Sequence, residues 1–98
     1  MNINEKKEYQ MISTVSKMLN VHPQTLRFYE KKGLIKPSRT SGNKRLFSRN
    51  NIEKIKLIQR LTNELGVNLA GVEVILNMRE TIRRLEKEKL ELEKKLTD

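Results

Sequence analysis

The sequence contains no cysteine, one histidine and no long apolar run. Without cysteine the chain cannot form disulfides, thiolate metal sites or a thiol redox switch, and His22 alone cannot build a metal site. No apolar stretch is long enough to cross a membrane, and the polar first residues, MNINEKKEYQ, do not resemble a secretion signal. We therefore expect a soluble, cytoplasmic protein without a metal or a cofactor.

Groups that an enzyme needs are also scarce. The 98 residues are enough for one small domain and an appended element, but not for a separate catalytic or ligand-binding domain. There is no glycine-rich loop that could cradle a phosphate, and the acidic residues lie mostly in the C-terminal part. The sequence therefore predicts a binding protein rather than an enzyme.

Positive charge is concentrated in the first sixty residues, which hold fourteen Lys and Arg against four Asp and Glu. The last thirty-eight residues hold seven against eight. A basic block attracts polyanions such as nucleic acid, while a nearly neutral tail that carries leucines can pair with another helix. Charge alone does not single out nucleic acid, so the positions of the cations decide the interpretation.

Two short helices joined by a short turn are predicted near the N-terminus. An apolar helical repeat begins near Ile12 with Ser13 as a candidate N-cap, and Asn20 interrupts it. Pro23 suits the first turn of a second helix, and Gly33 ends that helix about ten residues later. This is the outline of a helix-turn-helix.

The second helix has two different faces. Leu26 and Tyr29 can face the first helix, whereas the other face carries cations, an amide and an aromatic ring. Arg and Gln can bond base edges in a bidentate manner, so this face suits a recognition helix, although an ordinary solvated face is the alternative. Its residues are Gln24, Arg27, Phe28 and Lys31.

A small β-hairpin is predicted next. The chain is extended after Pro37, turns over residues 41–43 and returns through Leu46. A basic loop is commonly no more than a solvated loop, but one directly after a helix-turn-helix can lie along the phosphate backbone as a wing. Its cations are Arg39, Lys44 and Arg45.

Two further helices complete a predicted DNA-binding domain over residues 11–76, preceded by a disordered tail over residues 1–10. Ser48 can cap the third helix, and because the third residue after it is Asn51 rather than Glu, we expect an incomplete capping box. Asn68 can cap a short fourth helix. The predicted core is Ile12, Val15, Leu19, Leu26, Tyr29, Leu34, Phe47, Ile55, Ile58, Leu61, Leu69 and Val72.

Residues 77–98 are predicted to form a dimerisation helix. From Ile75 the apolar spacing alternates between three and four, which is typical of a coiled coil. The seam residues are Met78, Ile82, Leu85, Lys89, Leu92 and Leu96. Flanking charges could set the strand direction, which the pattern leaves open, and a tail that packs on its own domain or is partly disordered is the alternative.

The run HPQTLRFYEKKGLIKPSRTSGNKRLFS, followed by ELGVNLAGVEVIL and a helical tail, resembles the MerR family of winged-helix transcription regulators. The resemblance covers nearly the whole chain and depends most on TLRFYE followed by GLIKP. HPQ before TLR, PSRT in the wing and NLAGV are most similar to the HspR group, which represses chaperone operons. Nitrogen-regulating relatives share a wing like RTSGNKRLFS.

The resemblance implies a homodimer joined by an antiparallel coiled coil, with two recognition helices in successive major grooves of an inverted repeat in double-stranded DNA. By position, Arg27 and Tyr29 match TLRxYE, Arg45 matches the basic wing position, and Gln24 and Thr25 open the helix where base contacts are expected. Arg39 and Lys44 belong to the wing, and Phe28 stands where relatives often have Tyr, so a hydroxyl contact with phosphate is lost there.

For the HspR group the resemblance further implies a DnaK-type chaperone as co-repressor. We therefore expect a mainly α, winged helix-turn-helix repressor of heat-shock genes. Two alternatives remain, a nitrogen-regulator-like MerR protein and an interaction adaptor in which the heptad tail is active and the basic domain docks on RNA or an acidic protein.

Overall fold

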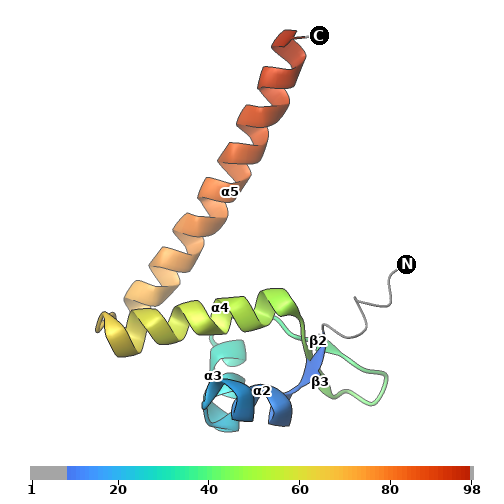
Figure 1. Cartoon of the computed structure of the whole chain (residues 1–98), viewed down its shortest axis with the longest axis vertical. Coiled ribbons are helices and arrows are strands. Elements are labelled where there is room, and N and C mark those ends of the chain that lie inside the picture. The colour runs from blue at the N-terminus through green and yellow to red at the C-terminus, as the bar shows by residue number, and fades with distance from the viewer. Residues whose placement is uncertain (1–8, 98) are drawn as a thin grey trace.

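The computed structural model describes residues 9–97 and is a mainly α, winged helix-turn-helix with a long C-terminal helix, as predicted (Figure 1). The helices are α2 (Ile12–Leu19), α3 (Pro23–Lys31), α4 (Arg49–Gln59), the π-helical turn η1 (Arg60–Glu64) and α5 (Leu69–Thr97). The strands are β1 (Gln10–Met11), β2 (Ser38–Arg39) and β3 (Arg45–Phe47).

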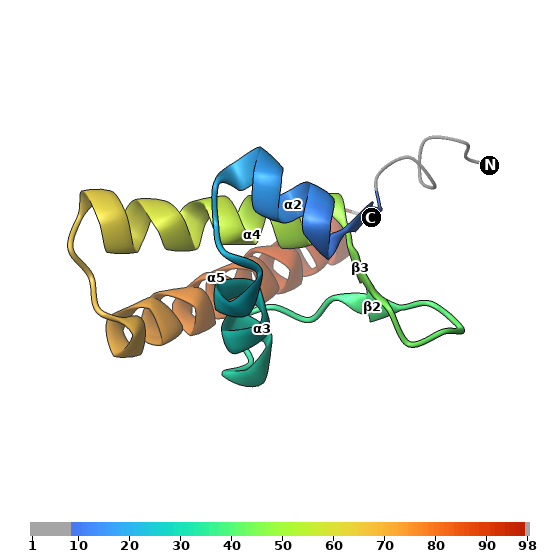
Figure 2. The ribbon, with the colours of Figure 1, turned by 90° about the horizontal axis from the view of Figure 1, so that it is seen from below.

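Helix α4 lies at the centre of the arrangement. Figures 1 and 2 show α2 and α3 on one side of α4, the β2–β3 hairpin near its N-terminal end, and α5 leaving the domain after the turn at its C-terminal end. The free end of α5 points away from α3 and the hairpin. The structure therefore separates the two parts that the charge distribution predicts to have different roles.

The turn between α2 and α3 is fixed by hydrogen bonds that the sequence did not reveal. Asn20 ends α2 in the left-handed region, at φ 51°, and the hydroxyl of Ser16 donates to the carbonyl of Val21 at 2.6 Å. From α4, the amide of Gln59 donates to the carbonyl of Leu19 at 2.9 Å. The angle between the two helices is thus held both locally and from the third helix.

The sheet has three antiparallel strands in the order β1-β3-β2, although only a hairpin was predicted. The added strand, β1, pairs Gln10 with Phe47 and Met11 with Leu46. The disordered tail was predicted over residues 1–10, and this range was too long because Gln10 is in strand β1. Residues 1–8 lie outside the described part of the chain. A two-residue strand is too short to show alternation in the sequence, and it forms because β3 offers an edge.

Because β1 runs directly into α2, the helix begins at Ile12, and Met11 occupies the N-cap position without a side-chain hydrogen bond. The prediction that Ser13 caps this helix was therefore wrong.

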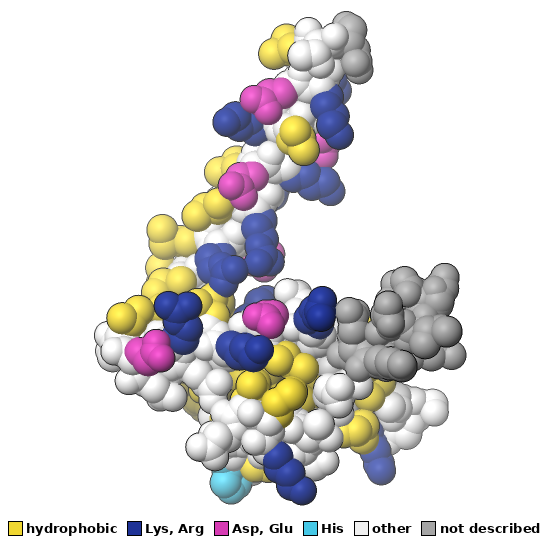
Figure 3. All heavy atoms as spheres, viewed as in Figure 1, with side chains coloured by type: hydrophobic (Ala, Val, Ile, Leu, Met, Phe, Trp, Pro, Cys, Tyr) yellow, Lys and Arg dark blue, Asp and Glu magenta, His cyan; other side chains and the backbone are white. Residues whose placement is uncertain are grey.

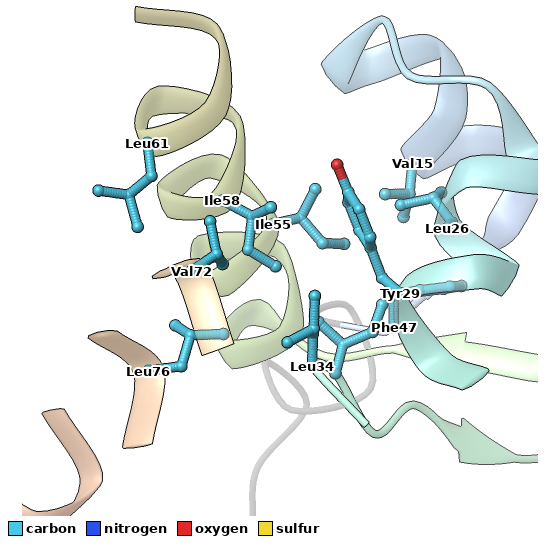
Figure 4. Close-up of a cluster of buried hydrophobic side chains, with 11 residues drawn as sticks. Val15, Leu26, Tyr29, Leu34, Phe47, Ile55, Ile58, Leu61, Val72 and Leu76 are labelled. Atoms are coloured by element: carbon cyan, nitrogen blue, oxygen red, sulfur yellow. The ribbon is translucent and has the colours of Figure 1, made fainter. Parts of the chain in front are cut away.

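The core lies between α4 and the elements around it (Figure 4). Nine of the twelve predicted core residues are buried, and the other three, Ile12, Leu19 and Leu69, pack against the cluster from its edge. Ile35 and Leu76 are buried but were not predicted. Ile35 follows a helix stop and falls in no regular local repeat, whereas Leu76 follows Leu69 and Val72 at helical spacing, so its burial was within reach of the sequence.

Helix α4 starts with a complete capping box, so the expectation of an incomplete one was wrong. The hydroxyl of Ser48 accepts from the Asn51 backbone N–H at 3.0 Å, and the Asn51 side chain accepts from the Ser48 N–H at 2.8 Å. Asn51 is buried, and its amide also donates to the carbonyl of Lys36 at 3.4 Å. An amide oxygen thus replaces the usual carboxylate, and the amide nitrogen ties the segment before the wing to α4.

The predicted fourth helix and dimerisation helix form one continuous helix, α5, of 29 residues. Its N-terminus is capped as predicted, because the Asn68 side chain accepts from the Gly71 N–H at 2.8 Å. Glycine fits here because a Cβ at Gly71 would lie 2.8 Å from Cγ1 of Val67. Within the described residues, no helix has the length and apolarity that crossing a bilayer requires.

We predict that Asn51→Ala lowers the free energy of unfolding by about 1–3 kcal/mol, because it removes one half of the capping box and the bond to the Lys36 carbonyl. Asn50→Ala is the matched control, since Asn50 is exposed and precedes Asn51 in the first turn of α4. Denaturant unfolding monitored by circular dichroism measures both. Equal losses in the two variants would contradict the role given to Asn51.

Candidate nucleic-acid interface

The outer face of α3 presents the four residues predicted from helical spacing. Gln24, Arg27, Phe28 and Lys31 are all exposed. Arg27 Nη1 donates to Gln24 Oε1 at 2.6 Å, so the two side chains most suited to base contacts are paired with each other. Phe28 is 40% exposed, and the ammonium of Lys32 lies 5.5 Å from the centroid of its ring. The face therefore offers cations, an amide and an apolar surface together.

The start of α3 is set by His22 and Pro23. The Nδ1 atom of His22 accepts from the Gln24 N–H at 3.1 Å, and Pro23 occupies the first helical position, where no N–H is needed. His22 is therefore the N-cap of α3. Because Nδ1 accepts here, any ring proton is on Nε2. At the other end, Gly33 adopts φ +78° and stops the helix.

The wing is a short hairpin organised by Thr40. Its N–H donates to the Lys44 carbonyl at 2.8 Å, its hydroxyl accepts from the Lys44 N–H at 3.1 Å, and its carbonyl accepts from the Asn43 N–H at 2.9 Å. Asn43 takes φ +65°, which lets the chain reverse. Lys44, at the tip of this turn, is exposed. The wing therefore carries Lys44 on a defined backbone rather than on a loose loop.

Arg39 and Arg45, the other two wing cations, are held by a residue that sequence reasoning missed. Glu30 in α3 accepts from Arg39 Nη2 at 2.9 Å and from Arg45 Nε at 2.5 Å. Glu30 was visible as the last letter of TLRFYE, but nothing local indicates that a side chain fifteen residues later meets it. The structure thus joins the recognition helix to the wing through three charged groups.

Tyr29 and Thr25 differ from the rest of the predicted contact set. Tyr29 is only 7% exposed and belongs to the core, as predicted from its spacing, and the DNA contact that the resemblance implies for it stays a prediction. Burial raises the pKa of its phenol above the ordinary value of 10.0. Tyr29 therefore favours the fold at neutral pH, and that contribution is lost at pH values above the pKa of the unfolded phenol. Thr25 is half-buried in the first turn of α3.

Helix α3 and the wing lie on the side of the domain away from the free end of α5 (Figure 1). Figure 3 shows His22, the single histidine, at this end of the molecule.

A cleft of about 520 Å³ between α4 and α5 is lined by Lys54, Arg60 and Arg79 among others. No group of three His, Asp or Glu side chains within residues 9–97 is arranged to hold a metal ion.

The predicted seam residues lie on the part of α5 that leaves the domain. Every described residue from 77 to 97 is exposed, so the alternative of a tail packed on its own domain is not what the structure shows. Figure 3 shows apolar side chains following one edge of this helix. The exposed fractions of the apolar seam residues are 58% for Met78, 51% for Ile82 and Leu85, 59% for Leu92 and 86% for Leu96.

The fold and the exposed α3 face define a winged helix-turn-helix protein. Residues 11–79 match the model of the MerR HTH family of regulatory proteins, and the chain therefore belongs to this family. A solved structure of HiNmlR, a MerR family regulator lacking the sensor domain and bound to promoter DNA, is similar to 86% of this chain and 64% of that one, with a TM-score of 0.71 and 24% identity. That likeness concerns the fold.

Named relatives agree with the family. The chain is 37% identical over 82 residues to a protein of Streptomyces coelicolor named heat shock protein HspR, which covers 84% of this chain and 54% of the relative. It is 38% identical over 69 residues to the regulator GlnR of Bacillus anthracis, covering 70% and 53%, and 33% identical over 69 residues to ZntR of Escherichia coli, covering 69% and 48%. The chain thus spans about half the length of these relatives. At the level of the family, the prediction of a transcription regulator rather than an enzyme is confirmed.

We predict that Arg27→Ala weakens binding to a preferred duplex by about 1–3 kcal/mol and relaxes sequence preference, because a guanidinium can bond a base edge. Lys44→Ala should instead weaken binding to all duplexes alike, since a wing lysine meets phosphate. Fluorescence anisotropy with specific and random duplexes measures both. Lys56→Ala, an exposed lysine on α4, is the control; parent-like binding by both test variants would show that the face is wrongly assigned.

Proposed function

We propose that the protein is a homodimeric repressor that binds an inverted repeat in double-stranded DNA and controls chaperone genes. The observation that carries the proposal is the opposition of two exposed surfaces. The α3 face and the wing offer cations on one side of the domain, and α5 offers an uncovered apolar seam on the other. The first surface suits a duplex, and the second suits another copy of the chain.

The exposure of α5 supports pairing with a second copy. Beyond Leu76, the described part of this helix buries no residue, and an isolated helix of this length is only marginally stable in water. A second seam of the same kind would cover the apolar residues without any other partner. Dimerisation also supplies the two-fold symmetry that an inverted repeat requires.

Charge argues against a parallel pair. In a parallel, in-register coiled coil Lys89 occupies a core position and faces Lys89 of the second copy, so two ammonium groups meet in the seam. Glu88 would flank Glu93 of the second copy, and symmetry repeats this repulsion on the other side. Both contacts disfavour the parallel arrangement.

An antiparallel pair removes both repulsions. When Ile82 lies opposite Leu85 of the second copy, Lys89 no longer faces itself, and Arg79 flanks Glu86 of the second copy on each side of the two-fold axis. We therefore propose an antiparallel coiled coil in this register. Helix α5 then holds two domains at opposite ends of one rod, each presenting its α3.

This register can be tested by exchanging charges. Arg79→Glu and Glu86→Arg should each weaken the dimer by about 1–2 kcal/mol, because each creates two like-charge contacts. The double variant should restore the parent's association. Sedimentation equilibrium at micromolar concentration measures all three, and a double variant that associates no better than the single ones would rule out the register.

Similarity to a relative named heat shock protein HspR supports a role in the heat-shock response. Control of chaperone genes with a DnaK-type chaperone as co-repressor is what the sequence resemblance to the HspR group implies. Similarity to GlnR at nearly the same identity supports a nitrogen-type regulator as the second candidate of the same class. The α3 face and the wing serve either role, so the bound sequence separates them. The adaptor alternative differs in class, since it requires no duplex preference.

Selection of bound duplexes from a random pool, with and without a DnaK-type chaperone, tests target and partner together. We expect an inverted repeat, and an affinity whose log-log dependence on salt has a slope of roughly −7 if each protomer meets about four phosphates. Enhanced binding with the chaperone would support co-repression. A slope near −2 with no two-fold repeat, together with equal binding to structured RNA, would favour the adaptor.

A further inference from the structure

Glu30 is the only described carboxylate that bonds the wing. It lies in the last turn of α3, its side chain is 22% exposed, and it receives Arg39 from β2 and Arg45 from β3 at 2.9 and 2.5 Å. The Arg45 side chain is 24% exposed, so this arm is partly shielded from water. Charge-assisted bonds of this kind are stronger than neutral ones and are screened less when partly buried.

Two features indicate that this cluster is more than an incidental surface pair. Arg39 and Arg45 are direct cross-strand partners, and like charges opposite each other destabilise a hairpin. Glu30 in turn lies at the C-terminal end of its helix, where the dipole disfavours a negative charge. Each group is unfavourable where it lies and becomes favourable only when the three meet.

We propose that Glu30 is a positioning residue that latches the wing to the recognition helix and thereby sets the specificity of DNA binding. This role rests on the proposed function. The latch fixes the separation between the two elements that would meet the duplex, α3 in a groove and the wing on the backbone. When the wing position is fixed, its contacts with the DNA backbone form well only on duplexes whose bases also fit α3.

The bonds to Glu30 also lower the contribution that Arg39 and Arg45 make to the non-specific attraction of DNA. Arg45 uses Nε for its bond, and Arg39 uses Nη2 for Glu30 and Nη1 for the carbonyl of Asn43 at 3.4 Å. Within the described residues the Arg45 terminal amines make no other hydrogen bond, while one carboxylate offsets part of the charge of both arginines. Lys44 then remains the wing cation with no ion pair among the described residues. Non-specific attraction is thus lower than three cations would give.

The test compares Glu30→Gln with Glu53→Gln, which makes the same change of charge at an exposed carboxylate on α4 paired with Lys56. Hydrogen exchange at the Thr40 and Asn43 amides is measured first, without DNA. In Glu30→Gln these amides should exchange roughly five to ten times faster, because loss of the latch lets the wing open. In Glu53→Gln they should exchange as in the parent.

Binding to the selected duplex and to a random duplex is then measured over a range of salt. Glu30→Gln should lower the ratio of specific to random affinity about tenfold, raise random affinity and steepen the salt slope by about one. Glu30→Asp keeps the charge but is too short to hold both arginines, so it should speed wing exchange while leaving the salt slope unchanged. It also replaces Glu30→Gln if that variant does not fold.

The latch would be overturned if the wing amides exchanged alike in Glu30→Gln, Glu30→Asp and Glu53→Gln. It would also be overturned if the parent is specific and Glu30→Gln has the same ratio of specific to random affinity as the parent. A parent that prefers no duplex would instead overturn the proposed function. The exchange measurement needs no DNA, so in that case it still decides whether the latch exists.

Discussion

Burial of one apolar face of α4 is the interaction on which the other elements depend. Ile55 and Ile58 are fully buried, and Figure 4 shows them between Tyr29 on one side and Val72 on the other. The helix-turn-helix has little core of its own, and α5 contributes only its first turns to the cluster. Because one helix face serves both, the position of the recognition helix and the direction of α5 are fixed by the same contacts.

What the sequence revealed was local. The stop at Gly33, the cap at Asn68 and the core residues Ile55 and Ile58 of α4 lie where spacing and turn chemistry placed them. What it did not reveal depends on partners distant in the chain. Strand β1 exists because β3 offers an edge, and Glu30 meets arginines nine and fifteen residues away.

Polar side chains complete what apolar packing begins. Ser16 and Gln59 fix the turn between α2 and α3, Asn51 joins the start of α4 to the segment before the wing, and Glu30 joins the wing to α3. Each of these contacts links two segments, whereas the buried cluster links all of them less specifically. In a small domain with few aromatic residues, such bonds set relative orientation, which is the property a duplex-binding surface needs.

Helix α5 contains neither glycine nor proline between Val72 and Thr97, so nothing in its backbone chemistry favours a hinge there. A stiff helix pair would fix the relative rotation of the two domains that it joins as well as the distance between them. On a duplex, one inserted base pair rotates the second half-site by roughly 34° about the helical axis. If two copies pair through α5 as proposed, the pair would not follow that rotation by bending within the helix, and the duplex would have to untwist to bring both half-sites into line.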